Sequence, residues 1–194
     1  MRNKSSRLLL PLLTLLAAAP AMAHTDGTAH SHLASFWAGA VHPWTGPDHL
    51  AAMLAVGVWS ALALKAPWRA PLAFAASLLA GAVLAMSTGW ALPAVEAGIT
   101  VSLAVLGLLV ALRTAMPPAA GAATAAILAF SHGAAHGQEL AGAAALAGMV
   151  GSTLVLHGLG LAMGWQLRAA PQVLRVLLGG SVALLALIRI TGAA

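Results

Sequence analysis

Long apolar stretches, separated by short segments that contain proline, glycine or charge, follow one another along most of this chain of 194 residues. A helix needs about 20 apolar residues to cross the hydrocarbon core of a membrane. Six stretches reach that length, and they cover residues 33–64, 70–90, 93–112, 117–136, 140–166 and 172–192. The pattern therefore predicts an all-α, polytopic membrane protein with a six-helix transmembrane bundle over residues 33–194.

The first of these stretches is too long for one straight span. Its 32 residues would extend about 48 Å as an α-helix, whereas the hydrocarbon core is about 30 Å thick. The stretch contains His42-Pro-Trp-Thr-Gly-Pro-Asp-His, in which prolines and a glycine interrupt the helix. We therefore predict a broken first helix, with a short outer helix over 33–42. A second helix should then begin at Pro47. Thr45 or Gly46 would be its cap.

The first 23 residues have the pattern of a cleavable signal peptide. A short apolar run over residues 8–19 follows a basic start, and Ala21-Met-Ala23 fits a cleavage site. The basic residues are Arg2, Lys4 and Arg7. An uncleaved transmembrane helix is the alternative, but the apolar run is short for a span. We expect residues 1–23 to be removed, which leaves a mature chain with a histidine-containing periplasmic tail over residues 24–32.

The composition argues against a soluble protein. Apolar residues make up 61% of the chain and charged residues 7%, and the mean hydropathy is +0.93, whereas soluble domains carry about 25% charged residues. The high isoelectric point reflects a lack of acids rather than a basic surface, so nucleic acid is not an expected partner. The chain contains no cysteine. This excludes disulfides, thiolate metal sites and cysteine nucleophiles.

The distribution of basic residues gives the orientation in the membrane. Cytoplasmic loops of membrane proteins carry an excess of lysine and arginine. With a cleaved signal and six crossings, only Arg189 of the mature basic residues falls outside. Those on the cytoplasmic side are Lys65, Arg69, Arg113, Arg168 and Arg175. We therefore predict a multi-pass protein of the bacterial inner membrane, with both mature termini in the periplasm.

Two clusters of ionisable side chains interrupt the apolar pattern. Ionisable residues within a membrane are costly and usually mark an ion or substrate path. One cluster lies at the predicted break of the first helix. In the other, the spacing of three and four residues places all members on one stripe of a helix. The six residues are His42, Asp48 and His49 in the first cluster and His132, His136 and Glu139 in the second. All six fall near the outer ends of their helices, so together they predict one site for a divalent ion.

The ligand chemistry narrows the choice of ion. Imidazole suits zinc, copper, iron and nickel, whereas sites built only from carboxylates suit magnesium, calcium and manganese. The mixed set of nitrogen and oxygen ligands favours Ni²⁺ or Co²⁺, with Zn²⁺ as a further possibility. The seven methionines are scattered rather than clustered, which argues against copper(I). We expect this ion to be a transported substrate, and we predict no bound cofactor.

Further ionisable residues have two interpretations each. His157, in the fifth apolar stretch, is either a second position for the ion or a helix–helix hydrogen-bonding group. Glu96 is either a surface carboxylate or an acid that attracts metal or couples protons. In the predicted N-terminal tail, His24, His30 and His32 either bind metal, as histidine-rich tracts often do, or form a solvated polar segment.

These motifs resemble those of the HupE/UreJ family of nickel and cobalt permeases. That family has a histidine, five residues and Asp-His in its first transmembrane segment, which here is His42 to His49. Its second signature is Phe-His-Gly-x-Ala-His-Gly-x-Glu. Here it is Ser131-His-Gly-Ala-Ala-His-Gly-Gln-Glu, in which Ser131 replaces the aromatic residue and Phe130 is adjacent. The resemblance covers the whole mature chain.

The resemblance implies that the six residues of the two clusters bind metal. It also implies that Glu96 matches a functional acid that some members have in the third segment. A nickel-enzyme assembly system, for hydrogenase or urease, is a possible partner implied by the resemblance alone. We therefore expect a secondary permease that takes up Ni²⁺ or Co²⁺ across the inner membrane. The sequence has no ATP-binding motif, so uptake would use the membrane potential or protons.

Three other functions account for parts of the same pattern. Histidines and carboxylates within a membrane can hold a catalytic zinc, with Ser131 as a nucleophile, in a membrane-embedded hydrolase. A metal-binding assembly factor would hand nickel to a partner without moving it across the membrane. A helix-packing protein would use the histidines only for structure. We expect no enzyme activity, because the sequence marks no substrate pocket.

Overall fold

The computed structural model describes residues 32–89, 91–140 and 142–191, and all regular secondary structure within these ranges is α-helical. Seven helices are formed. They are α2 (His32–Thr45), α3 (Pro47–Ala63), α4 (Arg69–Thr88), α5 (Val95–Leu112), α6 (Pro118–Glu139), α7 (Gly142–Leu167) and α8 (Gln172–Thr191). The predicted signal peptide, 1–23, and residues 24–31 of the predicted tail lie outside the described residues.

The surface and the composition of the helices are those of a membrane protein. Among the described helices, α4, α5, α7 and α8 are long and apolar enough to cross a bilayer. Large apolar side chains are exposed over the outside of the bundle, and Ile127, Leu177 and Ile190 are each at least 60% exposed. Such continuous apolar exposure requires an apolar environment. The all-α class and the membrane class predicted from the sequence are therefore supported, whereas six crossings remain a prediction.

The stretch predicted as a broken first helix forms two helices. Gly46 is extended, with φ −87° and ψ 112°, and it lies directly before Pro47, the first residue of α3. The Leu50 amide donates to the Gly46 carbonyl over 2.9 Å. The predicted outer helix over 33–42 was too short, because α2 continues through Pro43 to Thr45. The chain bends at Pro47, where a proline has no amide to continue the ladder.

Helices α2 and α3 lie end to end along α7 and run parallel to it. In the first half of α7, the Ser152 hydroxyl donates to the Ala40 carbonyl over 2.6 Å. Near its end, Arg168 Nε donates to the Ala61 carbonyl over 2.8 Å. Between these points a Cβ atom on Gly160 would overlap the Leu54 carbonyl. The missing side chain thus allows the two backbones to approach closely, as in other tightly packed membrane helices.

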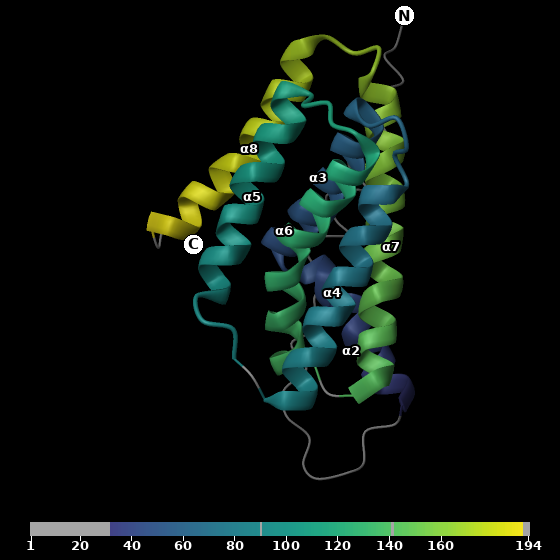
Figure 1. Ribbon diagram of the computed structural model, residues 1–194, viewed down its shortest axis with the longest axis vertical. Coiled ribbons are helices and arrows are strands. Elements are labelled where there is room, and N and C mark those ends of the chain that lie inside the picture. Colours follow the sequence, from purple (N-terminus) through teal and green to yellow (C-terminus); the bar gives the residue numbers. More distant parts are fainter. Residues whose placement is uncertain (1–31, 90, 141, 192–194) are drawn as a thin grey trace, which may run out of the picture.

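The other four helices form two further pairs, which Figure 1 shows side by side. Helices α4 and α6 are parallel, and Gly133 packs directly against the backbone of Leu78. Helices α5 and α8 are antiparallel, and Gly107 packs against the backbone of Gly179. The prediction for the fourth apolar stretch ended it at residue 136, but α6 continues to Glu139. The Leu140 amide closes this last turn by donating to the His136 carbonyl over 2.8 Å.

Candidate metal centre

The two ionisable clusters of the sequence meet at one place in the fold. His42 lies in the last turn of α2, His49 in the first turn of α3, and His132 and His136 in the last turns of α6. The ring centroids of His42 and His136 are 4.7 Å apart, and those of His49 and His136 are 4.4 Å apart. The His49 and His132 centroids are separated by 5.1 Å. Four imidazoles from three helices therefore form one contiguous group.

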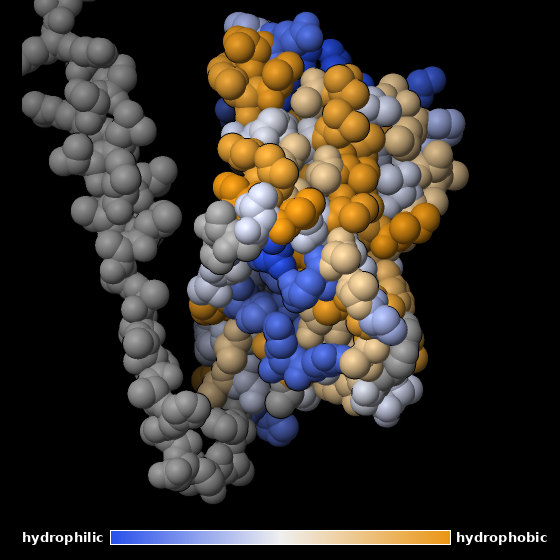
Figure 2. All heavy atoms as spheres, turned by 90° about the vertical axis from the view of Figure 1, so that its left-hand side faces the viewer, coloured by the Kyte–Doolittle hydropathy of each residue, from blue (hydrophilic) through white to orange (hydrophobic). Residues whose placement is uncertain are grey.

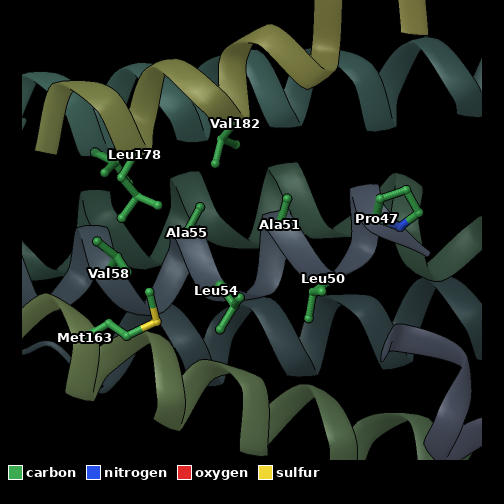
Figure 3. Close-up of a pocket in the computed structure, with 10 residues that line it drawn as sticks. Pro47, Leu50, Ala51, Leu54, Ala55, Val58, Met163, Leu178 and Val182 are labelled. Carbon is green, nitrogen blue, oxygen red and sulfur yellow. The ribbon is translucent and has the colours of Figure 1, made fainter. Parts of the chain in front are cut away.

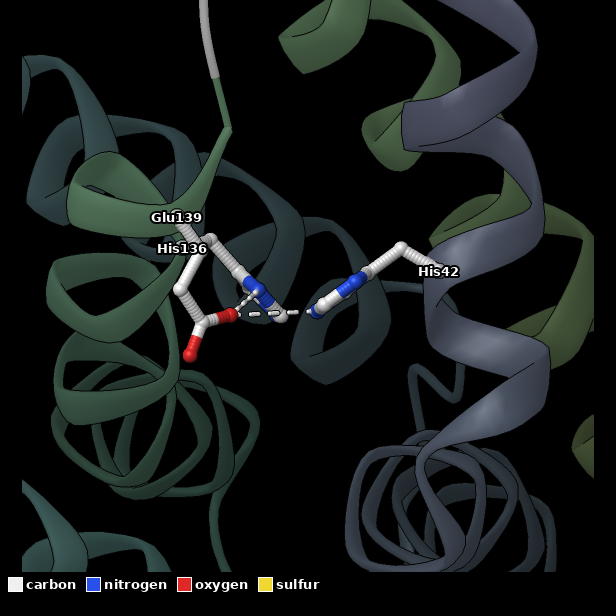
Figure 4. A group of neighbouring side chains, drawn as sticks. All are labelled: His42, His136 and Glu139. Carbon is white, nitrogen blue, oxygen red and sulfur yellow. Dashed lines mark ion pairs between the residues drawn. The ribbon is translucent and has the colours of Figure 1, made fainter. Parts of the chain in front are cut away.

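Three of the predicted ligands have the spacing of a metal site. His42, His136 and Glu139 each offer one ligand atom, and these atoms all lie within 4.8 Å of one another. In Figure 4 the Glu139 carboxylate points toward both rings. Its Oε2 is 3.3 Å from His42 Nε2 and 3.8 Å from His136 Nδ1. Metal–ligand bonds are about 2.0–2.2 Å long. The three ligand atoms would therefore need to move only slightly closer together for one ion to bind all of them.

Several imidazole nitrogens in this group are buried without a hydrogen-bond partner among the described residues. They are His49 Nε2, His132 Nδ1 and both ring nitrogens of His136. Buried polar atoms in proteins are almost always paired, and an unpaired one costs about 1–3 kcal/mol. This concentration of unpaired nitrogens at one point is the arrangement expected of a site that binds a ligand.

Two of the rings, those of His49 and His132, are held in orientation by hydrogen bonds to neighbouring side chains. Asp48 Oδ1 accepts from both the backbone amide and Nδ1 of His49, each over 2.9 Å. The Ser102 hydroxyl donates to the Ile99 carbonyl over 2.7 Å and lies 2.7 Å from His132 Nε2. Ser102 therefore accepts from Nε2–H, which leaves the lone pair on Nδ1 of His132. Metal-binding histidines are usually held in this way by a second group.

The site is open on one side and closed on the other. The side chains of His42 and Glu139 are 30% and 55% exposed, whereas His132 and His136 are fully buried. In the view from the flank of α5 and α8, hydrophilic side chains gather in a hollow part-way along the molecule, with apolar side chains above them (Figure 2). An ion can thus reach the exposed ligands from outside the bundle and meet the buried ones further in.

The order and spacing of these ligands can be compared with known proteins. The sequence model of the family described as HupE / UreJ protein matches residues 12–188. The chain belongs to the HupE/UreJ family. The family resemblance predicted from the two motifs is thus confirmed.

A curated relative supports the membership in the HupE/UreJ family. The chain is 40% identical over 167 residues to Protein HupE of Rhizobium leguminosarum bv. viciae, and the match covers 83% of each chain. A search of the solved structures finds no significant match.

Two predicted residues of this HupE/UreJ chain lie beside the three-ligand group rather than in it. Asp48 binds His49, and its Oδ2 accepts from Arg189 Nη1 over 2.7 Å. Glu96, in the first turn of α5, forms an ion pair with the same arginine. The sequence indicated Arg189 only as the one basic residue on the outer side of the membrane. Its role between two carboxylates depends on the contact between α8 and α3, which no local pattern reveals.

The remaining predicted accessory residues lie further away. His157 of α7 is buried, and both of its ring nitrogens lack a partner among the described residues. The Phe74 ring lies between it and His132, with centroids 5.1 Å and 5.8 Å away. His32 is exposed at the start of α2, about 15 Å before His42 along the helix. His24 and His30 lie outside the described residues. Ser131, the predicted nucleophile of the hydrolase alternative, packs against Gly98 of α5.

Proposed function

We propose that this protein is a secondary permease that takes up Ni²⁺, or Co²⁺, across the bacterial inner membrane. The observation that carries the proposal is the group of His42, His136 and Glu139, whose ligand atoms lie within 4.8 Å of one another in an apolar helical bundle. On the buried side, the His49 ring contacts His136, and the His132 ring in turn contacts His49. Imidazole with a carboxylate is a ligand set that suits late first-row divalent ions. The motifs shared with nickel and cobalt permeases support the same metals.

The buried histidines provide a route from the entry site toward the middle of the bundle. An ion bound by the partly exposed His42 and Glu139 can exchange one ligand at a time for His132. His157, on the other side of the Phe74 ring, then offers two nitrogens that have no hydrogen-bond partner within the described part of the chain. Sequential exchange of this kind keeps each binding step reversible, which conduction requires. We propose His157 as a second, inner position for the ion.

The distribution of arginines supports entry from the periplasm. Arg113 Nε donates to the Leu62 carbonyl and Arg168 Nε to the Ala61 carbonyl, both over 2.8 Å, at the end of α3 remote from the ligands. That end of α3 is about 20 Å from Asp48. Basic residues favour the cytoplasmic side, so the ligand cluster faces the periplasm. Alternation of six crossings would then place both mature termini there as well, as the sequence predicts.

Uptake by the purified protein tests the proposal directly. Proteoliposomes that contain the full chain are expected to accumulate radiolabelled Ni²⁺ when an inside-negative potential is imposed, because two charges moving through 100 mV release about 4.6 kcal/mol. Competition with excess Co²⁺ and Zn²⁺ then ranks the metals. Binding without uptake would favour an assembly factor that serves a hydrogenase or urease, and zinc-dependent hydrolysis of ester or amide substrates would favour the hydrolase. Failure to bind any metal would favour a helix-packing protein in which the histidines have only a structural role.

Loss of the hydrogen bond that orients His132 is expected to weaken metal binding. In Ser102→Ala the ring can rotate or exchange its tautomer, so its Nδ1 lone pair is no longer held toward the cluster. We expect about tenfold weaker Ni²⁺ binding by titration calorimetry, at the lower end of the range for such supporting groups. Ser77→Ala is the matched control, because the Ser77 hydroxyl donates only to the Ala126 carbonyl. Equal affinities for the two variants would contradict the assignment of His132 as a ligand.

A further inference from the structure

Arg189 places a fixed positive charge at the edge of the proposed metal site. Its Nη1 donates to Asp48 Oδ2 over 2.7 Å, its Nη2 binds Glu96, and its Nε lies 3.4 Å from the Thr100 hydroxyl. The other oxygen of Asp48 already accepts two hydrogen bonds from His49. Both oxygens of this buried carboxylate are therefore engaged, and the one that faces Arg189 is held by a cation.

The helix that carries Arg189 is only lightly attached to the ligand-bearing helices. Helix α8 packs mainly against α5 and touches α3 at few points. An apolar cavity of about 260 Å³ separates α3 from α8, with Ala51 and Ala55 on one wall and Leu178 and Val182 on the other (Figure 3). Because a cavity forgoes the contacts of a filled interface, the Arg189–Asp48 ion pair is a principal polar link between these two helices.

We propose that Arg189 is a tethered cation that occupies Asp48 until a metal ion displaces it. This inference rests on the proposed function, because it concerns how the same site gains its ion. A divalent ion coordinated by Asp48 Oδ2 would lie beside the guanidinium that binds the same oxygen, and the two positive charges repel each other. When the metal takes the carboxylate, Arg189 retains Glu96, whose side chain is 70% exposed, as its partner. Binding of the metal at Asp48 then also breaks the ion pair that links α8 to α3.

The exchange explains why a site with many ligands releases its ion. Each metal ion bound at Asp48 must first break a charge-assisted hydrogen bond, which lowers the affinity. On departure of the ion, the arginine returns and closes the carboxylate to rebinding. Arg189 is thus a positioning residue that sets the affinity of the site through Asp48 and makes no contact with the metal.

A double-mutant cycle on Ni²⁺ affinity tests this inference. Arg189→Ala is expected to bind Ni²⁺ about tenfold more tightly than the wild type, since one charge-assisted hydrogen bond no longer has to be broken. In the Asp48→Asn background the same substitution should change the affinity by less than about twofold, because the competition acts only through Asp48. Arg189→Met, which keeps the length of the side chain, serves if the alanine variant does not fold.

Arg175→Ala is the matched control, because it removes the same charge from the opposite end of α8. Its affinity should equal that of the wild type. Weaker or unchanged binding in both Arg189 variants would overturn the inference, as would a gain that persists in the Asp48→Asn background. Either result leaves the proposed permease intact as long as the wild type binds and transports Ni²⁺. Absence of Ni²⁺ binding by the wild type would instead reject the permease itself.

Discussion

Replacing His136 by alanine is expected to abolish metal uptake and to weaken Ni²⁺ binding by more than about 100-fold. Loss of a group that only orients a ligand already reduces metal affinity by about 10- to 100-fold. The His136 ring contacts both His42 and His49, and neither of its buried nitrogens has a hydrogen-bond partner among the described residues. The measurement is titration calorimetry of the purified variant together with radiolabelled Ni²⁺ uptake by cells that express it.

The control for this substitution lies on the same side of the bundle. His32→Ala removes an exposed imidazole at the start of α2, about 15 Å from His42, and is expected to leave binding unchanged. His42→Ala should resemble His136→Ala in both assays. Wild-type uptake by the His42 and His136 variants would reject the three-ligand group. Equal losses in all three variants would instead show that the N-terminal histidine contributes to uptake.

Leucine at Gly160 is expected to prevent correct assembly of α3 on α7. A Cβ atom at this position would overlap the Leu54 carbonyl, and backbone cannot move aside as a flexible side chain can. Overpacking of this kind costs about 3 kcal/mol, a large share of the stability of a single domain. We expect Gly160→Leu to aggregate on detergent extraction or to lose much of its thermal stability, measured by size-exclusion chromatography after heating.

The matched variant is Gly158→Leu. Gly158 lies two residues earlier on α7, and an added Cβ there would meet no other packed atom of the described residues within 4 Å. Its leucine variant should differ from the wild type by less than about 0.5 kcal/mol, as for exposed substitutions in general. A stable, monodisperse Gly160→Leu protein would show that α3 and α7 do not pack through this glycine. Instability of both variants would show that α7 tolerates no added bulk on either face.

Much of the fold follows from local signals in the sequence. Apolar length marked every long helix, and Pro47 marked the start of α3, because proline fits the first turn of a helix better than its interior. The end of α2 was not predicted correctly, since Pro43 was expected to stop the helix and instead lies within its last turn. One proline near a helix end removes a single hydrogen bond, and the packing of α2 on α7 compensates for that loss.

Part of the candidate site could likewise be predicted from local sequence patterns, and part of it depends on tertiary packing. His132, His136 and Glu139 could be grouped from their spacing alone, because residues three and four apart share a helix face. Their meeting with His42 was predicted from the common depth of the two clusters near the outer ends of their helices, whereas the actual contact depends on how α2 and α6 are placed in the bundle. Ser102 and Arg189 carried no signal of their own. Each contacts a residue that is 30 or more positions away in the sequence, and only the packing of the bundle brings the two together.

Gly46 is the residue between α2, which carries His42, and α3, which carries His49. Its φ and ψ are open to any amino acid, so its backbone conformation does not require glycine. A side chain there would press on His49 Nδ1 and Asp48 Oδ1, which lie 3.0 and 3.1 Å from the position of an added Cβ. His42 and His49 thus lie on two helices that are joined by a single residue without a side chain. An alanine at this position would therefore require the side chains of His49 and Asp48 to shift by a few tenths of an ångström, which would change their placement relative to His42.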